Sequence, residues 1–470
     1  MKTNTETEEL DLEAPQQKPE QSIKGKTDLL NGEVHSTLRK FSAPLALSFL
    51  VNMIYSWIDM YFVSRMGDKA IVALGVSDQF GFFIFTLGSG FAVGTGIVVA
   101  RRIGERNIED ANKTATQALV GMLTISTILM GFVLLTSSFI LPKLGASGLS
   151  LDYALAYITF LALGIPANLT TFQINNTIRS SGNSIFPMMV LLMTSAVNLL
   201  FAPILIFGWG FQGFGIAGAG MATALAQWAG LIFSFWYLNT GKLQVRLDFN
   251  NFKIKLDTQW LIAKIGFPGS LQMLSVSLTR IGLYSIVAKF GESVLAAYTL
   301  GLRVDFIVFM IVFAVGVAME IITGQHLGAQ KVKRIFEYHR SAMLQLGSLM
   351  VFLGAIVYMF GVNLVSIFTK DPVTISESVS YLHVLVFGYL AFSIAVVSMR
   401  ILSGAGSTVK SLIVVASSHI FVMLPLCYFF AFYTPYKQYG VWYGIVISYV
   451  LMMIFSLVEV YRGKWITKKV

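Results

Sequence analysis

The chain has 470 residues, of which 55% are hydrophobic and only 12% are charged, and its formal net charge is +10. A soluble domain carries about 25% charged residues, so a chain this apolar is predicted to lie in lipid, and its basic balance does not indicate nucleic acid as a partner. One cysteine, Cys427, excludes an intramolecular disulfide, and the five histidines show no ligand spacing. We therefore predict no metal site and no cofactor.

Residues 1–38 are polar and contain none of the apolar core that a signal peptide requires. Acidic residues gather near the start of this stretch, between Glu6 and Glu13. We expect a disordered cytoplasmic tail, with a regulatory arm as the alternative.

Twelve stretches beyond the tail are apolar enough to cross a bilayer, since a spanning helix needs about 20 apolar residues. The first six are expected near 41–64, 70–100, 114–141, 151–178, 187–208 and 213–238. The second six are expected near 260–289, 294–325, 340–368, 377–402, 411–433 and 440–461. This pattern predicts an all-α integral membrane protein with five parts: the tail, an N-terminal lobe (39–238), a connector (239–259), a C-terminal lobe (260–461) and a basic end (462–470).

The distribution of lysine and arginine sets the expected orientation. With the N-terminus placed inside, most of the 34 basic residues fall in the tail, the cytoplasmic connectors and the basic end. Three lie within spans, and the outer connectors hold Arg65, Lys69, Lys143, Lys289, Lys370 and Lys437. Because cytoplasmic loops carry an excess of basic residues, both termini are expected in the cytoplasm.

The sequence contains an internal duplication. A shift of 224 residues places Lys40 on Lys264 and Pro44 on Pro268. The same shift pairs Gly67 with Gly291, Ala73 with Ala297, Gly104 with Gly328, Tyr157 with Tyr381, Gly164 with Gly388 and Gly182 with Gly406. Six spans repeated in one orientation indicate two lobes around a central cavity, and rocking of such lobes favours a transporter over a channel.

Several short motifs resemble the multidrug and toxic compound extrusion (MATE) family. The stretch 58–67 resembles the end of that family's first helix, and 179–183 resembles its fourth-to-fifth helix turn. The segments 100–104 and 324–329 resemble the cytoplasmic ends of its second helix and of the repeat of that helix. The resemblance covers roughly residues 38–465. It is closer to the DinF-like and archaeal members than to the NorM-like members, whose seventh-helix glutamate has no counterpart at 274–276.

This resemblance implies two six-helix lobes in a V and the export of small amphipathic or cationic drugs by antiport with protons or sodium ions. It also implies a monomer in the plasma membrane that needs no cofactor beyond the coupling ion.

Asp59 is the first candidate for the coupling site. It lies in the outer half of the first span, six residues before Arg65. A carboxylate within a span is costly, at about 2.5–3.5 kcal/mol at the bilayer centre, and is a functional candidate for that reason. Burial disfavours the ionised carboxylate, so Asp59 could take up and release a proton. The alternative is an aspartate solvated near the outer headgroups.

The resemblance also implies partners for Asp59. The archaeal-type site uses a tyrosine that fits Tyr55, an asparagine that fits Asn198 and a threonine that fits Thr223. Its second aspartate is replaced by Ala202. The lost carboxylate weakens the case for sodium, which needs several oxygen ligands, so proton coupling is favoured. For Asn198 and Thr223 the alternative role is hydrogen bonding between helices.

The C-terminal lobe places four charged residues within spans: Arg280, Arg303, Asp305 and Glu320. Charges in spans usually face a cavity or pair with one another. We expect Arg280 to pair across helices with Glu320 or Asp305, either as a structural ion pair or in a substrate or proton path. Asp78 in the second span is a candidate cavity residue, with packing inside the lobe as the alternative.

Two other functions compete with antiport. A flippase for lipids or lipid-linked saccharides would share the two-lobe architecture, but it would be expected to carry more basic residues in its cavity than Arg280 and Arg303. An intramembrane enzyme would need a catalytic pair inside the membrane, and none stands out. No Walker A motif or Ser-His-Asp set is present, which disfavours ATP-driven transport.

Overall fold

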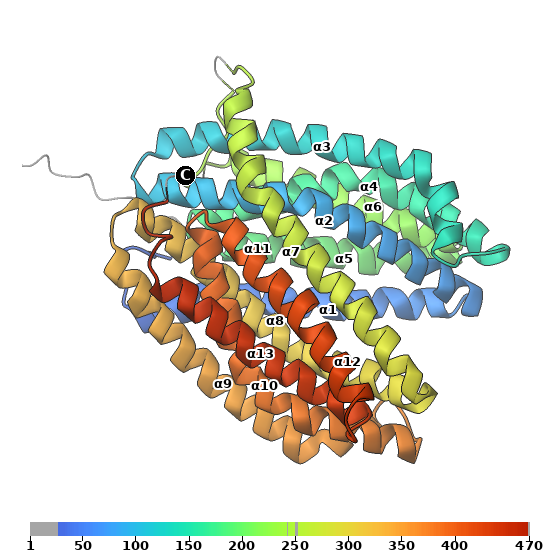
Figure 1. Ribbon diagram of the computed structural model, residues 1–470. Helices are drawn as coiled ribbons and strands as arrows, with labels where there is room; N and C mark the ends of the chain where they lie inside the picture. The colour runs from blue at the N-terminus through green and yellow to red at the C-terminus, as the bar shows by residue number, and fades with distance from the viewer. Residues whose placement is uncertain (1–26, 242, 250–251, 469–470) are drawn as a thin grey trace, which may run out of the picture.

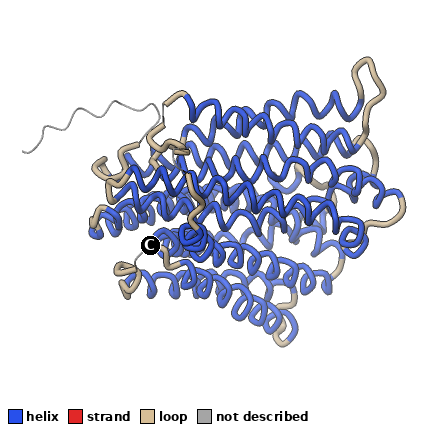
Figure 2. Tube along the Cα trace, turned by 90° about the horizontal axis from the view of Figure 1, so that it is seen from above, coloured by secondary structure: helices blue, strands red, loops and turns tan. Residues whose placement is uncertain are grey.

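The protein is a bundle of long helices, as described by a computed structural model that covers residues 27–241, 243–249 and 252–468. Within these residues no strand occurs, and twelve helical spans are long and apolar enough to cross a membrane. Figure 2 shows that the helices run alongside one another and that the loops gather at their two ends. The predicted all-α membrane fold is therefore confirmed.

The first lobe contains six helices: α1 (Val34–Ser64), α2 (Asp68–Gly104), α3 (Ile108–Lys143), α4 (Leu149–Ser180), α5 (Ile185–Phe207) and α6 (Ile216–Asn239). The second contains α7 (Leu256–Val287) with a short 3-10 turn η1 (Ala288–Phe290), α8 (Glu292–Gly328), α9 (Val332–Ser366), α10 (Pro372–Gly404) and α13 (Gln438–Tyr461). Its fifth span is built from α11 (Thr408–Ala416), the π-helix η2 (Ser417–Met423) and α12 (Leu424–Phe432).

Most helices extend beyond the predicted spans, chiefly at the end of the bundle where both described chain ends lie, here called the terminal end (Figure 1). Helix α2 continues to Gly104 and includes Arg101 and Arg102 in its last turn. Basic side chains stabilise the negative end of a helix dipole, so the helix persists past the apolar stretch. The apolar stretch in the sequence marks only the membrane-crossing part of the helix, so the predicted span ends before this extension.

The boundary expected for the polar tail is wrong, because α1 begins at Val34, within the predicted tail. The Glu33 side chain caps this helix by accepting hydrogen bonds from the backbone N–H groups of His35 and Ser36. Residues 27–33, here called the N-terminal segment, also pack against the bundle and form hydrogen bonds with it. Residues 1–26 of the predicted tail lie outside the described residues.

The duplication appears in the backbone conformation. Gly67 and Gly291, which precede α2 and α8, have φ of 94° and 102°. Arg106 and Gln330, which follow the same two helices, have φ of 59° and 58°. An arginine and a glutamine adopt this left-handed conformation only at some energetic cost, so its occurrence at two positions 224 residues apart reflects one inherited turn geometry.

The two lobes meet at the terminal end and spread apart toward the opposite end (Figure 1). The first helix of each lobe begins by packing against the other lobe. Leu38, Phe41 and Leu45 of α1 belong to the apolar core of the second lobe. Ile262 and Ile265 of α7 belong to an apolar core of the first lobe. This exchange joins the lobes along one side of the bundle.

Glycines allow the lobe backbones to touch at this junction. A Cβ atom on Gly94 of α2 would lie 2.3 Å from the Ile262 carbonyl oxygen, and one on Gly266 of α7 would lie 2.0 Å from the Gly90 carbonyl oxygen. A Cβ atom on Gly104 would lie 2.0 Å from the backbone oxygen of Gln325 in α8. Small residues at helix interfaces let membrane helices approach this closely.

The N-terminal segment crosses the same junction. Its Thr27 N–H donates to the carbonyl of Gly182 in the first lobe at 2.9 Å. The Tyr338 hydroxyl of the second lobe donates to the Leu29 carbonyl at 3.1 Å, and the Leu29 side chain is buried. The segment therefore holds both lobes together at the terminal end.

We predict that Gly266→Ala destabilises this arrangement, because its methyl group has no room against the Gly90 backbone. Overpacking of this kind costs about 1–3 kcal/mol of unfolding free energy, seen as a lower melting temperature of the purified protein in detergent. Gly269→Ala is the matched control, since no atom lies within 4 Å of its Cβ position. Equal melting temperatures for the two variants would show that the junction does not depend on close backbone contact.

Candidate functional site

A polar cluster lies inside the first lobe around Asp59 of α1. One carboxylate oxygen of Asp59, Oδ1, is buried and has no hydrogen-bond partner. Tyr55, one turn earlier on α1, and Asp78 of α2 lie close enough to Asp59 to interact electrostatically with it. Tyr157 of α4 is buried and interacts with both carboxylates. The structure thus brings the candidate Asp59 together with Tyr55 and Asp78.

The two remaining candidates close this cluster from α5 and α6. The Asn198 side-chain amide donates to the Thr223 hydroxyl at 3.2 Å, and that hydroxyl donates to the Ala219 carbonyl at 3.1 Å. The hydroxyls of Tyr55 and Tyr157 lie next to the Thr223 hydroxyl. The hydrogen bonding between helices that was the alternative role for these residues is therefore present, and it places them beside the carboxylates.

The second carboxylate of this site comes from an unexpected helix. Ala202 of α5 is fully buried and offers no ligand, as its sequence indicates. Asp78 of α2 is the second acid that lies near Asp59. Two carboxylates in a poorly hydrated place repel each other, and a bound proton or metal cation relieves that repulsion. The site therefore offers two carboxylates and several neutral oxygens, although no group of three or more acidic, histidine or cysteine ligands occurs among the described residues.

The second lobe holds a different polar cluster around Asp305 of α8. Its carboxylate is buried and accepts hydrogen bonds from the hydroxyls of Tyr381, at 2.6 Å, and Tyr389. Tyr381 is the repeat partner of Tyr157, so one tyrosine position serves the polar cluster of each lobe. The sequence showed this pair only as a landmark of the duplication, and its role beside the acids was missed.

The predicted ion pair of Arg280 is wrong. Glu320 of α8 pairs with Arg400 of α10 at 2.6 Å, and Asp305 bonds to tyrosines. Arg280 of α7 and Arg303 of α8 are both exposed and form no ion pair with any residue that the structure describes. Arg280 instead lies close enough to the buried Tyr298 of α8 to interact with it electrostatically.

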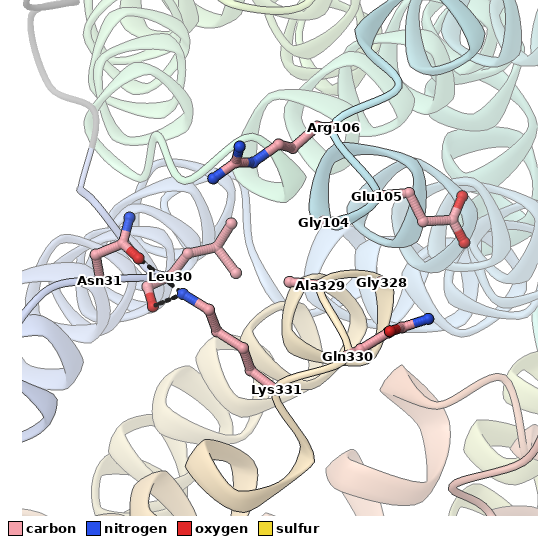
Figure 3. A pocket seen from close by; sticks show the side chains of 9 residues that line it. All are labelled: Leu30, Asn31, Gly104, Glu105, Arg106, Gly328, Ala329, Gln330 and Lys331. Carbon is pink, nitrogen blue, oxygen red and sulfur yellow. Dashed lines mark hydrogen bonds between the residues drawn. The ribbon is translucent and has the colours of Figure 1, made fainter. Parts of the chain in front are cut away.

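A pocket of about 280 Å³ lies at the terminal end, where the N-terminal segment meets the turns after α2 and α8 (Figure 3). Lys331 donates to the Leu30 carbonyl and to the Asn31 side chain there, while Glu105 points away from them. The pocket borders Gly104, which is about 39 Å along α2 from Asp78 at 1.5 Å per residue. It is therefore part of the junction between the lobes and not of the acidic cluster.

Comparison with solved structures supports the fold. A MOP superfamily transporter from Pyrococcus furiosus Vc1 (DSM3638) superposes with a TM-score of 0.89 at 24% identity, over 96% of this chain and 100% of that chain. A multidrug resistance MATE family transporter of the MOP superfamily, in an outward-facing conformation, gives a TM-score of 0.88 at 24% identity over 94% and 98%.

Relatives of similar length agree with this result. The chain is 25% identical to the probable multidrug resistance protein YoeA of Bacillus subtilis (strain 168), over 93% of this chain and 96% of the relative. It is 26% identical to the FAD transporter of Shewanella oneidensis, over 86% and 90%. The MatE family model matches residues 44–204 and 268–429, one match in each lobe. The chain thus belongs to the MatE family of multidrug and toxic compound extrusion proteins, and it is a membrane transporter and not an enzyme.

Proposed function

We propose that the protein exports amphipathic small molecules, organic cations among them, in exchange for a proton that binds Asp59. The observation that carries this proposal is the buried Asp59 Oδ1, which has no hydrogen-bond partner and lies beside a second carboxylate, Asp78. An unsatisfied buried oxygen is a ready acceptor for a cation. Uptake of a proton by either acid reduces the repulsion between them.

The names of the relatives support a small-molecule substrate. YoeA and a NorM protein of Thermotoga maritima are named as probable multidrug resistance proteins, and the Shewanella relative is named as a transporter of FAD. The binding pocket of the Pyrococcus transporter is described as having reverse polarity, which suggests a different function for that protein.

Coupling follows from the position of the acidic cluster among five helices of one lobe. It joins α1, α2, α4, α5 and α6, so a change in its charge alters the packing of the first lobe. Helices α1 and α2 also carry the contacts with the second lobe. Proton binding would therefore shift the balance between lobe arrangements through these two helices, as alternating access requires.

We predict that a proton gradient, imposed across proteoliposomes, drives ethidium efflux and that Asp59→Asn reduces it by about tenfold or more, since the amide cannot carry a proton at this position. Asp68→Asn, in the exposed first turn of α2, is the control and should leave efflux unchanged. Efflux driven by sodium alone would contradict proton coupling. An active Asp59→Asn variant would remove Asp59 from the mechanism.

The proposed orientation places the terminal end in the cytoplasm, because most basic residues lie at that end. In a Cys427→Ala background, Lys143→Cys should react with a membrane-impermeant maleimide on intact cells. Lys464→Cys should react only after the cells are permeabilised. Both positions are exposed, so the opposite labelling pattern would reverse the assigned orientation.

A further inference from the structure

Two arginines of the second lobe lie on the helix faces that form the junction between the lobes. The backbone of Ile262 in α7 touches Gly94 of α2, and Met273 further along α7 accepts a hydrogen bond from Ser89 at 3.8 Å. Arg280 lies about five helical turns beyond Ile262 and about two beyond Met273, because about 3.6 residues make a turn. It therefore continues the face of α7 that packs against the first lobe.

Arg303 occupies the corresponding face of α8. Gly328, at the terminal end of this helix, touches the backbone oxygen of Arg101 in α2. Arg303 lies about seven turns before Gly328, on the same side of the helix. Asp305 lies two residues away and points into the lobe, where it bonds to its tyrosines. Arg303 thus lies on the side of α8 that faces the first lobe at its terminal end.

Both arginines lie within helices that are long and apolar enough to cross a membrane. Arg303 is about 16 Å along α8 from its start at Glu292, and Arg280 is about 10 Å along α7 from its end at Val287. The hydrocarbon core of a bilayer is about 30 Å thick. Arginines within such helices face a cavity or a partner, and neither residue forms an ion pair with any described side chain.

The surroundings of the arginines fit an amphipathic ligand. Met273, Phe306 and Ile307 are exposed apolar side chains near the arginines on α7 and α8. The first lobe presents acids instead, since Asp78 of α2 lies near Asp59 in its polar cluster. The two lobes therefore carry opposite charge where they diverge.

We propose that Arg280 and Arg303 form an anion-binding site for the transported substrate, which carries a carboxylate or phosphate group on an apolar body. The inference rests on the proposed export function and narrows its substrate class. The planar guanidinium group binds such oxyanions through two parallel hydrogen bonds. In a zwitterionic substrate the cationic group would face the acids of the first lobe.

The test compares two dyes that differ in one charge, rhodamine B, which carries a carboxylate, and its ethyl ester, which does not. Transport is measured in phosphatidylcholine proteoliposomes that contain no anionic lipid. Arg280→Gln and Arg303→Gln should each raise the KM for rhodamine B about tenfold, since each removes a charge-assisted contact, and change the KM for the ester by less than about twofold. Arg280→Lys, which retains the charge, should recover part of the affinity.

Lys264→Gln is the matched control, because Lys264 lies on α7 about half a turn away from the face of Arg280. It should leave the KM for rhodamine B unchanged. Binding of rhodamine B to the purified variants, followed by fluorescence anisotropy beside their melting temperatures, separates lost affinity from lost folding. Weaker binding at an unchanged melting temperature supports the site.

Four results would overturn the inference. Equal losses for both dyes in the arginine variants would indicate a structural role. If the wild type transports the ester but not rhodamine B, the anion site is contradicted while the proposed export is not. If it transports neither dye nor ethidium, the proposed export itself is contradicted. Unchanged rhodamine B transport, with slower movement of a fluorescent phosphatidylglycerol in separate vesicles that contain this lipid, would assign the arginines to a lipid headgroup.

Discussion

Close contact between helix backbones at the terminal end is the constraint on which the rest of the structure depends. Gly90 and Gly94 of α2 touch α7, and Gly104 touches α8, so the first lobe meets the second without intervening side chains. Helices joined so closely at one end diverge at the other when their axes are not parallel, and the two lobes spread apart accordingly (Figure 1). The N-terminal segment and the exchanged starts of α1 and α7 reinforce the same end. This arrangement leaves the acids and the arginines in the half of the molecule where the lobes are free to move.

The cost of burying charge explains which polar residues are structural and which are free to act. Glu320 is satisfied by Arg400, and Asp305 is satisfied by two tyrosine hydroxyls, so neither needs a further partner. Asp59 retains a buried oxygen without a partner, and Arg280 has no ion pair among the described residues. A charged group that has no protein partner within the membrane needs a ligand, an ion or water as its partner. Function is therefore assigned to the unsatisfied groups, and the satisfied ones stabilise the second lobe.

The sequence predicted the fold closely because apolar length, basic connectors and repeated glycines are properties of the chain itself. It also predicted that Tyr55, Asn198 and Thr223 accompany Asp59, through a family resemblance. It could not predict that Asp78 of α2 lies near Asp59, because that depends on how α1 and α2 face each other in space. The expected pairing of Arg280 failed for a related reason. Partners in a helical bundle are set by the rotation of each helix, and one residue of spacing turns a side chain by about 100°.

The two lobes have similar backbone geometry but different polar residues. Their turns have matching left-handed residues, and Tyr157 and Tyr381 occupy the same place beside an acid in each lobe. The acids themselves differ, since Asp59 corresponds to Leu283 and Asp305 corresponds to Gly81. A symmetric protein with a proton site in each lobe would move both lobes on protonation. Here the carboxylate with an unsatisfied oxygen, Asp59, lies in the first lobe, while Arg280 and Arg303 lie in the second. Such a division allows one lobe to sense the ion and the other to hold an anionic substrate, so that exchange is coupled through the junction between them.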